Sequence, residues 1–374
     1  MGAEIIKVER PGGGDISREY GPYINDISLY FCQYNRGKKG LAVDMRSDIG
    51  KEVVMDLVGK VDIVIENFKN GTLERLGIGY EEMLKVNPEL IYGSICGFGT
   101  HGPLSHLPCM DIIAAARSGL VAQTGVDGGA PIKPGFSMCD TWAGLHLLRG
   151  LSMALLNRQQ TGKGCRIDIA MLDCAFYMCE EPVLQHSLTG EFRSRTGNQH
   201  PIFAPYGEFA SKDGNVVLGI TKEEEWAAFC EAMGLSHLAA DSKFADNESR
   251  NNNRDALLAE IETVTAKMGR YEIEEKLTKV NVPAAAVQTL AEFVGNPQTD
   301  ELKVITKIDQ PGVGEYTAVS TPIRFSKTPV NPNAEAPGFP GAHSTEVLRK
   351  YLGYSEEKIE ELLNSGAICQ TEVC

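Results

Sequence analysis

The chain has 374 residues, of which 43% are hydrophobic, and a formal net charge of −14 at pH 7. This length and composition exclude a disordered chain, and single cores stop growing near roughly 250–300 residues, so we expect two structural units. The acidic charge repels polyanions and argues against nucleic acid as the main partner. Apolar runs fall short of the roughly 18 residues that span a bilayer, and the start has no signal-peptide pattern, so we expect a cytoplasmic protein with no membrane partner.

Ten cysteines are scattered along the chain, with no C-x-x-C pair and no short Cys/His cluster. Zinc sites need closely spaced ligands, so we expect no metal. The cysteines are typical of reduced, mostly buried thiols in a cytosolic protein.

The first half of the chain alternates short β-branched runs with helical stretches. Strands are expected at residues 4–9, 62–67 and 90–96, and helices at residues 48–61 and 80–86. This order predicts a mostly parallel sheet flanked by helices, as in α/β proteins.

Two longer helices are expected next, at residues 111–124 and 139–160. A strand at residues 165–169 then runs through a sharp turn into another helix. A polar, irregular stretch at residues 192–205 marks a linker. It leads to a second region, with a strand at residues 216–220 and helices near 223–233, 255–268 and 271–279.

Asp173 is the only charged residue between Ile169 and Cys179, and it lies where the strand at 165–169 passes into a helix. We expect the carboxylate to be buried, at a cost that the free N–H groups of a helix N-terminus offset. Such a carboxylate stays ionised and can act as a nucleophile. An aspartate that only caps a helix has the same pattern, so both interpretations stay open.

A short basic run at residues 35–39 contains Arg36, Lys38 and Lys39 in an otherwise acidic chain. It could bind an anion locally, or it could be a solvated turn.

Blocks along nearly the whole chain resemble the family III CoA transferases, the formyl-CoA and carnitine-CoA transferase (CaiB/BaiF-like) family. Their order and spacing carry the resemblance more than any single block does. The blocks are GAEIIKVERPGGGD, NRGKKGLAVDM, DIVIENFKNG, LIYGSICGFGTHGP, DTWAGL, TGKGCRIDIAMLDCA, APYGEFASKDG, NVPAAAV and PGFPGAHSTEVLRKYLGYSEEKIEELLNSG.

The resemblance implies that Asp173 is the nucleophile. It would carry an acyl group as a mixed anhydride and then coenzyme A as a thioester, so that CoA moves from an acyl-CoA to a small carboxylic acid without a metal. It also implies that residues 66–71 line the CoA site, with Asn67 and Phe68 at the adenine and Lys69 in place of the usual arginine. Arg36, Lys38 and Lys39 are further phosphate candidates.

Two alternatives remain within the same superfamily. Acyl-CoA racemases pass a proton between a histidine and an aspartate, and Asp140 matches that aspartate. Methionine, Met110, stands in the histidine's slot and cannot accept a proton. The second alternative is a catalytically impaired partner subunit, since the glycine-rich loop of some relatives does not occur between residues 207 and 283.

We therefore expect a Rossmann-like large domain with a mostly parallel sheet, from residues 1–190 and 310–374, in an interlocked homodimer. Residues 191–205 would be a linker, and residues 206–309 a smaller α+β domain with its return linker. The resemblance implies that relatives begin some 20–30 residues earlier, with a first strand and a helix. A version of the protein extended by that strand is expected to be more stable and more active.

Overall fold

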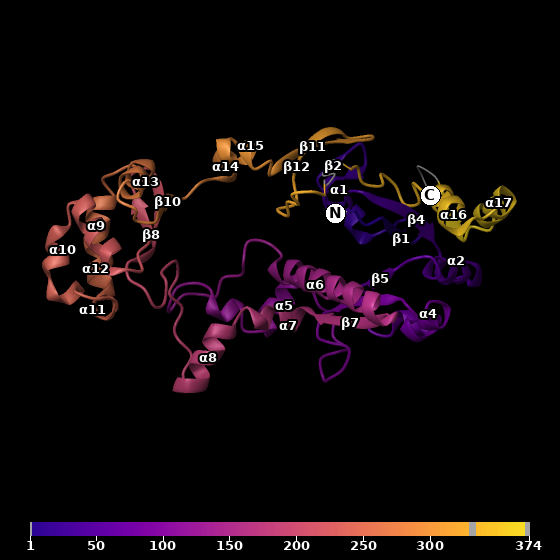
Figure 1. Cartoon of the computed structure of the whole chain (residues 1–374), viewed down its shortest axis with the longest axis horizontal. Helices are drawn as coiled ribbons and strands as arrows, with labels where there is room; N and C mark the ends of the chain where they lie inside the picture. The colour runs from indigo at the N-terminus through magenta and orange to yellow at the C-terminus, as the bar shows by residue number, and fades with distance from the viewer. Residues whose placement is uncertain (1, 329–333, 371–374) are drawn as a thin grey trace. The chain divides into compact units, whose positions relative to one another are not determined.

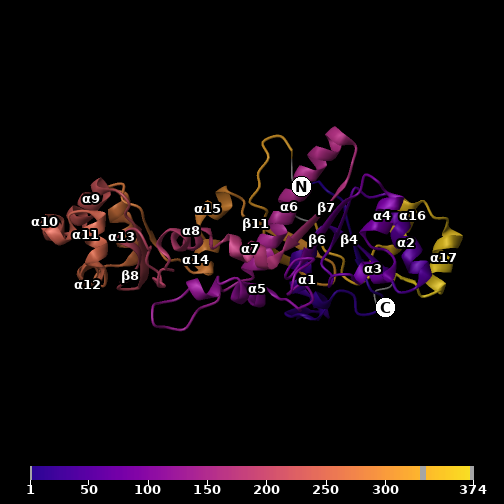
Figure 2. The same ribbon diagram turned by 90° about the horizontal axis from the view of Figure 1, so that it is seen from below.

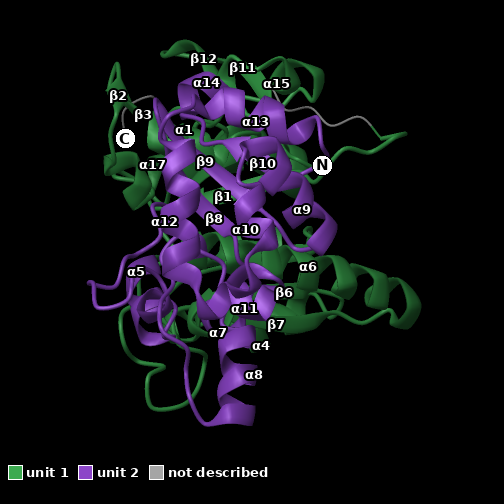
Figure 3. Ribbon diagram, turned by 90° about the vertical axis from the view of Figure 1, so that its left-hand side faces the viewer, with its two compact units in different colours: residues 1–110, 139–174, 294–374 green, residues 111–138, 175–293 purple. Residues whose placement is uncertain are grey.

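The computed structural model describes residues 2–328 and 334–370. The chain divides into two compact units (Figure 3). Unit 1 comprises Met1–Met110, Cys139–Cys174 and Val294–Cys374, and unit 2 comprises Asp111–Met138 and Ala175–Phe293. The domain boundaries expected from the sequence stay a prediction.

Unit 1 contains two three-stranded sheets (Figure 1). In the first, β1 and β4 are parallel and β13 is antiparallel to β4; in the second, three parallel strands lie in the order β5-β6-β7. These sheets confirm the predicted α/β class. The strands are β1 (Ile5–Glu9), β4 (Lys38–Val43), β5 (Ile63–Glu66), β6 (Ile91–Cys96), β7 (Cys165–Ala170) and β13 (Ile368–Cys369).

One apolar core is shared by the two sheets of unit 1. It joins Leu41 and Val43 of β4 to Tyr92 of β6 through side chains of the helices α2, α4, α16 and α17. The opposite face of β5-β6-β7 is covered by α6, which lies along β7 in both views (Figures 1 and 2). The helices are α2 (Asp48–Val58), α4 (Tyr80–Val86), α6 (Met138–Thr161), α16 (Ser344–Leu352) and α17 (Glu356–Asn364).

An ion pair ties the first strand of unit 1 to segments distant in sequence. The Arg18 guanidinium donates to the buried Glu9 carboxylate at 2.7 Å and to the Gly338 carbonyl oxygen at 2.8 Å, and it lies 3.6 Å from the centre of the Phe31 ring. The smaller elements of unit 1 are η1 (Ile16–Glu19), β2 (Tyr23–Ile24), β3 (Ile27–Ser28), α1 (Leu29–Asn35), α3 (Thr72–Leu76), α15 (Pro297–Glu301), β11 (Ile305–Gln310) and β12 (Gly314–Val319). Helices α7 (Met171–Tyr177) and α14 (Leu290–Val294) have residues in both units, and α6 has its first residue, Met138, in unit 2.

Unit 2 packs helices against an antiparallel sheet of order β10-β9-β8. Its core surrounds Arg250, whose side chain is 2% exposed. The guanidinium donates to both Glu223 carboxylate oxygens at 2.8 Å and to the Ala204 carbonyl oxygen at 2.7 Å. The elements are α5 (Asp111–Arg117), η2 (Val121–Gln123), α8 (Glu180–Thr189), β8 (Tyr206–Ser211), β9 (Gly214–Gly219), α9 (Glu223–Met233), α10 (Ser236–Ala240), η3 (Ser242–Phe244), α11 (Asn247–Asn252), α12 (Arg254–Thr265), α13 (Arg270–Thr278) and β10 (Ala284–Ala286).

The helix expected at residues 111–124 ends at Arg117, because Gly119 adopts a positive φ and a short 3-10 turn follows, so its expected length is wrong. Eight cysteines of the described residues have free thiols. Among the described helices, none combines the length and the apolar character needed to cross a bilayer.

Replacing Arg250 by alanine should destabilise unit 2 by about 3 kcal/mol, because it leaves buried carbonyl oxygens without donors and empties a filled core position. Denaturation followed through the fluorescence of Trp226, whose ring lies 5.1 Å from the Arg250 guanidinium, measures the change. Arg349→Ala is the control, since Arg349 also donates two hydrogen bonds to one carboxylate, that of Glu356, but on the surface. Equal midpoints for the two variants would contradict the prediction.

Candidate functional site

Asp173 lies in the first turn of α7, three residues after β7 ends at Ala170. The preceding residue, Leu172, donates its backbone N–H to the Gly97 carbonyl oxygen at 3.0 Å, which joins the start of α7 to the loop after β6. The Asp173 residue is exposed, while Cys174 and Ala175 beside it are buried. The expected burial of this carboxylate is therefore wrong, because Met171, Cys174 and Ala175 of the apolar run are buried and Asp173 is not. An exposed carboxylate is open to a substrate.

The loop after β6 passes close to Asp173. A Cβ at Gly97 would lie 2.1 Å from the Cβ of Cys109, so only glycine fits there. Burial raises the pKa of the Cys96 thiol, and the charges of Asp168, Glu66 and Asp173 raise it further. These three carboxylates therefore lie within electrostatic reach of the end of β6.

A row of polar side chains crosses the sheet β5-β6-β7 towards this loop. The strand register aligns Glu66, Ser94 and Asp168, and it aligns Tyr92 with Arg166 in the next row. Parallel sheets are normally apolar on both faces, and here the other face follows that rule. A polar row on a buried strand indicates a site or a structural network.

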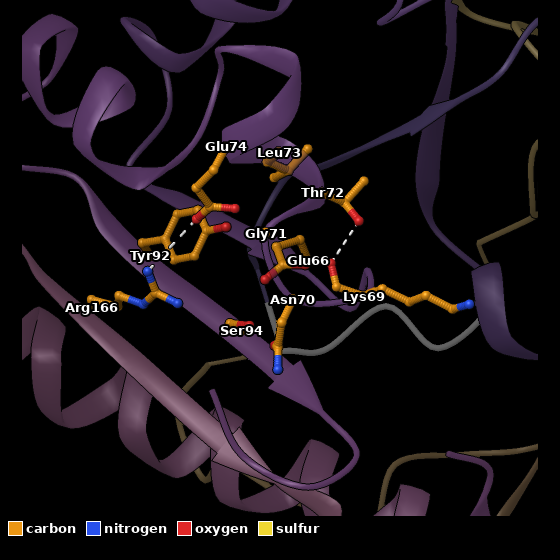
Figure 4. Close-up of a pocket in the computed structure, with 10 residues that line it drawn as sticks. All are labelled: Glu66, Lys69, Asn70, Gly71, Thr72, Leu73, Glu74, Tyr92, Ser94 and Arg166. Atoms are coloured by element: carbon orange, nitrogen blue, oxygen red, sulfur yellow. Dashed lines mark hydrogen bonds and ion pairs between the residues drawn. The ribbon is translucent and has the colours of Figure 1, made fainter. Parts of the chain in front are cut away.

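A small pocket opens over this polar face, lined by residues from both rows and from the turn after β5 (Figure 4). Arg166 donates to the Asp168 carboxylate at 3.0 Å and lies 5.5 Å from the centre of the Tyr92 ring. Burial raises the pKa of Tyr92, with Glu66 and Glu74 adding to the effect, so its phenol is neutral. The positive charge of Arg166 is balanced by its acidic neighbours.

The turn after β5 presents Asn67, Phe68 and Lys69 to solvent. The Phe68 backbone N–H donates to the Glu66 carboxylate at 2.7 Å. The Phe68 residue is 44% exposed. In Figure 4 the Lys69 side chain runs away from Tyr92. Its ammonium group forms no ion pair with any described residue, so it is available to an anion. An exposed ring beside a free cation suits a nucleotide.

The basic run lies at the beginning of β4, in the other sheet of unit 1. Arg36 donates to the Val319 carbonyl oxygen at 2.9 Å, and Lys39 pairs with Glu346 at 3.1 Å. Lys38 donates to the Asn35 side chain at 2.9 Å, and burial lowers its pKa. The structure thus gives all three cations intramolecular partners, and it groups Asn67, Phe68 and Lys69 separately from them.

Asp140 is the third residue of α6 and is exposed. The pKa of Tyr30 is raised by partial burial, by Tyr34 and by the charge of Asp140, which places that carboxylate near α1. Met110 is 67% exposed. In the described residues, no group of three or more His, Cys, Asp or Glu side chains could hold a metal ion.

Comparison with known proteins identifies the class to which this α/β fold and site belong. Residues 1–344 match the profile of CoA-transferase family III. The succinyl-CoA:mesaconate CoA-transferase of Haloarcula hispanica is 38% identical over 93% of this chain and 89% of its own. The acetyl-CoA:oxalate CoA-transferase of Acetobacter aceti is 37% identical over 82% and 79%, and the mouse (Mus musculus) succinyl-CoA:glutarate CoA-transferase is 35% identical over 100% and 85%.

Solved structures agree with the sequence comparison. A CaiB/BaiF family protein from Brucella suis superimposes with a TM-score of 0.83 at 34% identity, over 94% of this chain and 92% of the other. The protein is thus a transferase of coenzyme A. The chain belongs to CoA-transferase family III, as its sequence blocks predicted.

Two features were not predicted from the sequence: the polar face of β5-β6-β7, and the hydrogen bonds of Asn70, in the turn after β5, to the Gly99 and Ser105 carbonyl oxygens. The period of two in CRIDIA, which places Arg166 and Asp168 on one face, is the signal that could have revealed the first. Asn70 has no such signal, because its partners lie 29 and 35 residues away.

Gly97→Ala should lower CoA-transfer activity by about tenfold or more, because the added methyl group must push the loop away from Cys109 and so from the start of α7. Gly144→Ala on α6 is the control, since a Cβ there meets open space. It should keep full activity and gain stability. Steady-state rates and melting temperatures of both variants test this, and wild-type activity in Gly97→Ala would refute it.

Proposed function

We propose that this enzyme moves coenzyme A from an acyl-CoA donor to a small dicarboxylic acid, with Asp173 as the covalent carrier. The observation that carries the proposal is the exposed Asp173 carboxylate at the carboxyl edge of a parallel sheet, beside the glycine loop after β6. Ligands of α/β proteins bind at that edge. The dicarboxylate class rests on relatives whose names specify oxalate, mesaconate and glutarate.

In the proposed reaction a carboxylate oxygen of Asp173 attacks the donor thioester carbonyl, and the C–S bond breaks to give a mixed anhydride and CoA thiolate. The thiolate then attacks the Asp173 carbonyl of the anhydride, which releases the donor acid and leaves an aspartyl-CoA thioester. The acceptor carboxylate attacks this thioester and expels the thiolate again, forming a second anhydride. Attack of the thiolate on the acceptor carbonyl releases the new acyl-CoA and restores Asp173.

CoA itself would bind on the turn after β5. Phe68 and Asn67 contact the adenine in this proposal, and Lys69 pairs with a phosphate. Arg36, Lys38 and Lys39 are proposed as secondary phosphate contacts, with lower weight because each already has an intramolecular partner. Asp140 is proposed as a second acidic group of the site, through its proximity to Tyr30.

We also propose a cytoplasmic, interlocked homodimer with a Rossmann-like large domain. Helix α6 supports the dimer, because it is apolar on two faces. The face formed by Leu147, Leu151 and Ala154 packs on the sheet. On the other face Leu145, Leu148 and Leu156 are exposed, and an uncovered apolar stripe of this kind indicates a protein partner.

An isomerase is the second candidate within the same superfamily. It needs a second base, and the exposed Met110 in that slot cannot supply one. A catalytically impaired subunit is the third candidate, and it would bind acyl-CoA without forming an adduct.

Asp173→Asn should abolish CoA exchange, lowering the rate by about a thousandfold or more, because the amide is nearly isosteric but cannot form the anhydride. The assay is a CoA-exchange screen with succinyl-CoA or acetyl-CoA as donor and a panel of mono- and dicarboxylic acids as acceptors. Borohydride or hydroxylamine trapping with mass spectrometry locates the adduct. Asp62→Asn, at the other end of the strands, is the control and should exchange normally.

The same screen separates the candidate functions. An adduct at Asp173 with exchange into dicarboxylates supports the proposal. Exchange of the α-proton without adduct would replace it by the isomerase, and binding with neither reaction would replace it by the impaired subunit.

Lys69→Ala should raise the KM for acyl-CoA by about tenfold with little change in kcat, because one phosphate contact is lost and the chemistry is untouched. The wild-type KM should rise with ionic strength, and that of the variant should rise less. Lys163→Ala, an exposed lysine before β7, is the control. An unchanged KM in Lys69→Ala would remove Lys69 from the CoA site.

A further inference from the structure

Asn70 joins the turn after β5 to the loop after β6. Its side-chain Nδ2 donates to the Gly99 carbonyl oxygen at 2.9 Å and to the Ser105 carbonyl oxygen at 2.9 Å. Both partners are acceptors only, so the amino end of the amide must point at the loop. Figure 4 shows the Asn70 side chain directed to the tip of the strand that carries Ser94, while Lys69 runs away from it.

The turn that carries Asn70 is held by its own hydrogen bonds. Glu66 accepts from the Phe68 N–H, and the Thr72 hydroxyl donates to the Lys69 carbonyl oxygen at 2.6 Å. The Arg75 guanidinium donates to the Asn70 carbonyl oxygen at 3.3 Å. The Asn70 backbone is therefore held by bonds within the turn and from α3, and its side-chain amide can in turn hold the loop.

The loop, in contrast, has little support of its own. The other hydrogen bonds of residues 99–107 within the described structure join positions one to three apart, such as Ser105 N–H to the Gly102 carbonyl oxygen at 3.3 Å. The two bonds from Asn70 are the long-range ones. At its beginning the loop is tied to α7, because Gly97 accepts from the N–H of Leu172.

We propose that Asn70 is a positioning residue for CoA transfer. Its amide fixes residues 99–105, and through them it holds the backbone at Gly97 beside the start of α7, where Asp173 must meet the thioester. The turn proposed to bind CoA and the loop beside the nucleophile thus move as one body. This inference rests on the proposed function, because it assigns Asn70 a role in that reaction.

The chain contains a matched control for this arrangement. The Asn87 Nδ2 also donates to two backbone carbonyl oxygens, those of Val58 at 3.0 Å and Val61 at 2.9 Å. It lies before β6, at the opposite end of the same strands. Removing either amide removes two hydrogen bonds to backbone carbonyl groups, so a general loss of stability should be similar in the Asn70 and Asn87 variants. Of the two residues, only Asn70 contacts the loop.

The experiment compares Asn70→Ala and Asn70→Asp with Asn87→Ala and Asn87→Asp. Single-turnover mixing with succinyl-CoA, followed by borohydride trapping, gives the rate of adduct formation at Asp173 and the half-saturating concentration. Both Asn70 variants should form adduct about tenfold more slowly, with half-saturation changed less than about threefold, because orientation rather than binding is lost. The Asn87 variants should stay within about twofold of wild type. Backbone hydrogen exchange of residues 98–107 should accelerate in the Asn70 variants alone.

Two results would overturn the inference: wild-type adduct rates in the Asn70 variants, or equal slowing in the Asn87 variants. If Asn70→Ala does not fold, Asn70→Asp decides the question, since it keeps the size of the side chain and removes both donors. Absence of adduct in the wild-type protein would refute the proposed function and the catalytic role with it. Hydrogen exchange then still tests whether Asn70 holds residues 99–105 in place. Unchanged exchange in the Asn70 variants would refute that structural role as well.

Discussion

The candidate site depends on the parallel hydrogen-bond register of β5, β6 and β7. Because the three strands run in the same direction, the segments that follow them leave from one edge of the sheet. Those segments are the turn at residues 67–71, the glycine loop from Gly97 and the helix that begins at Met171. Residues more than 100 positions apart in the sequence are thereby brought to one place, and the catalytic assignment to Asp173 depends on that convergence.

The same register sets the electrostatics of the site. Alternation along the strands sends isoleucine side chains of β5, β6 and β7 to α6 and sends Glu66, Ser94 and Asp168 to the opposite face. Arg166 lies among these acidic groups and over the rings of Tyr80 and Tyr92. Arg166 pairs with Asp168 and lies near Glu74, so it offsets only part of the negative charge on this face of the sheet.

Much of this arrangement could be predicted from the sequence, because local patterns determine it. The β-branched runs at β1, β5 and β6 and the apolar spacing of α2 and α4 gave strands and helices within a few residues of their observed ends. The exposure of Asp173 could not be predicted, since an apolar run does not tell which single side chain of a short helix faces outward. The hydrogen bonds of Asn70 could not be predicted from the sequence either, because they depend on the path of a loop that has no periodic pattern. The β11-β12 hairpin was missed for a related reason, since its strands alternate too weakly to separate them from the proline-rich segment that follows.

Two thiols lie near the proposed nucleophile, Asp173: Cys96 at the end of β6 and Cys174, the next residue in the chain. Burial raises the pKa of both, and the Asp173 charge raises each further, so both stay protonated at neutral pH. A protonated thiol is a poor acyl acceptor, because the thiolate is the reactive form. Once Asp173 carries an acyl group or CoA in the proposed scheme, it is uncharged, so burial is the effect that still keeps both thiols protonated. Their burial therefore shields activated acyl and CoA esters on Asp173 from capture by the protein's own sulfur atoms.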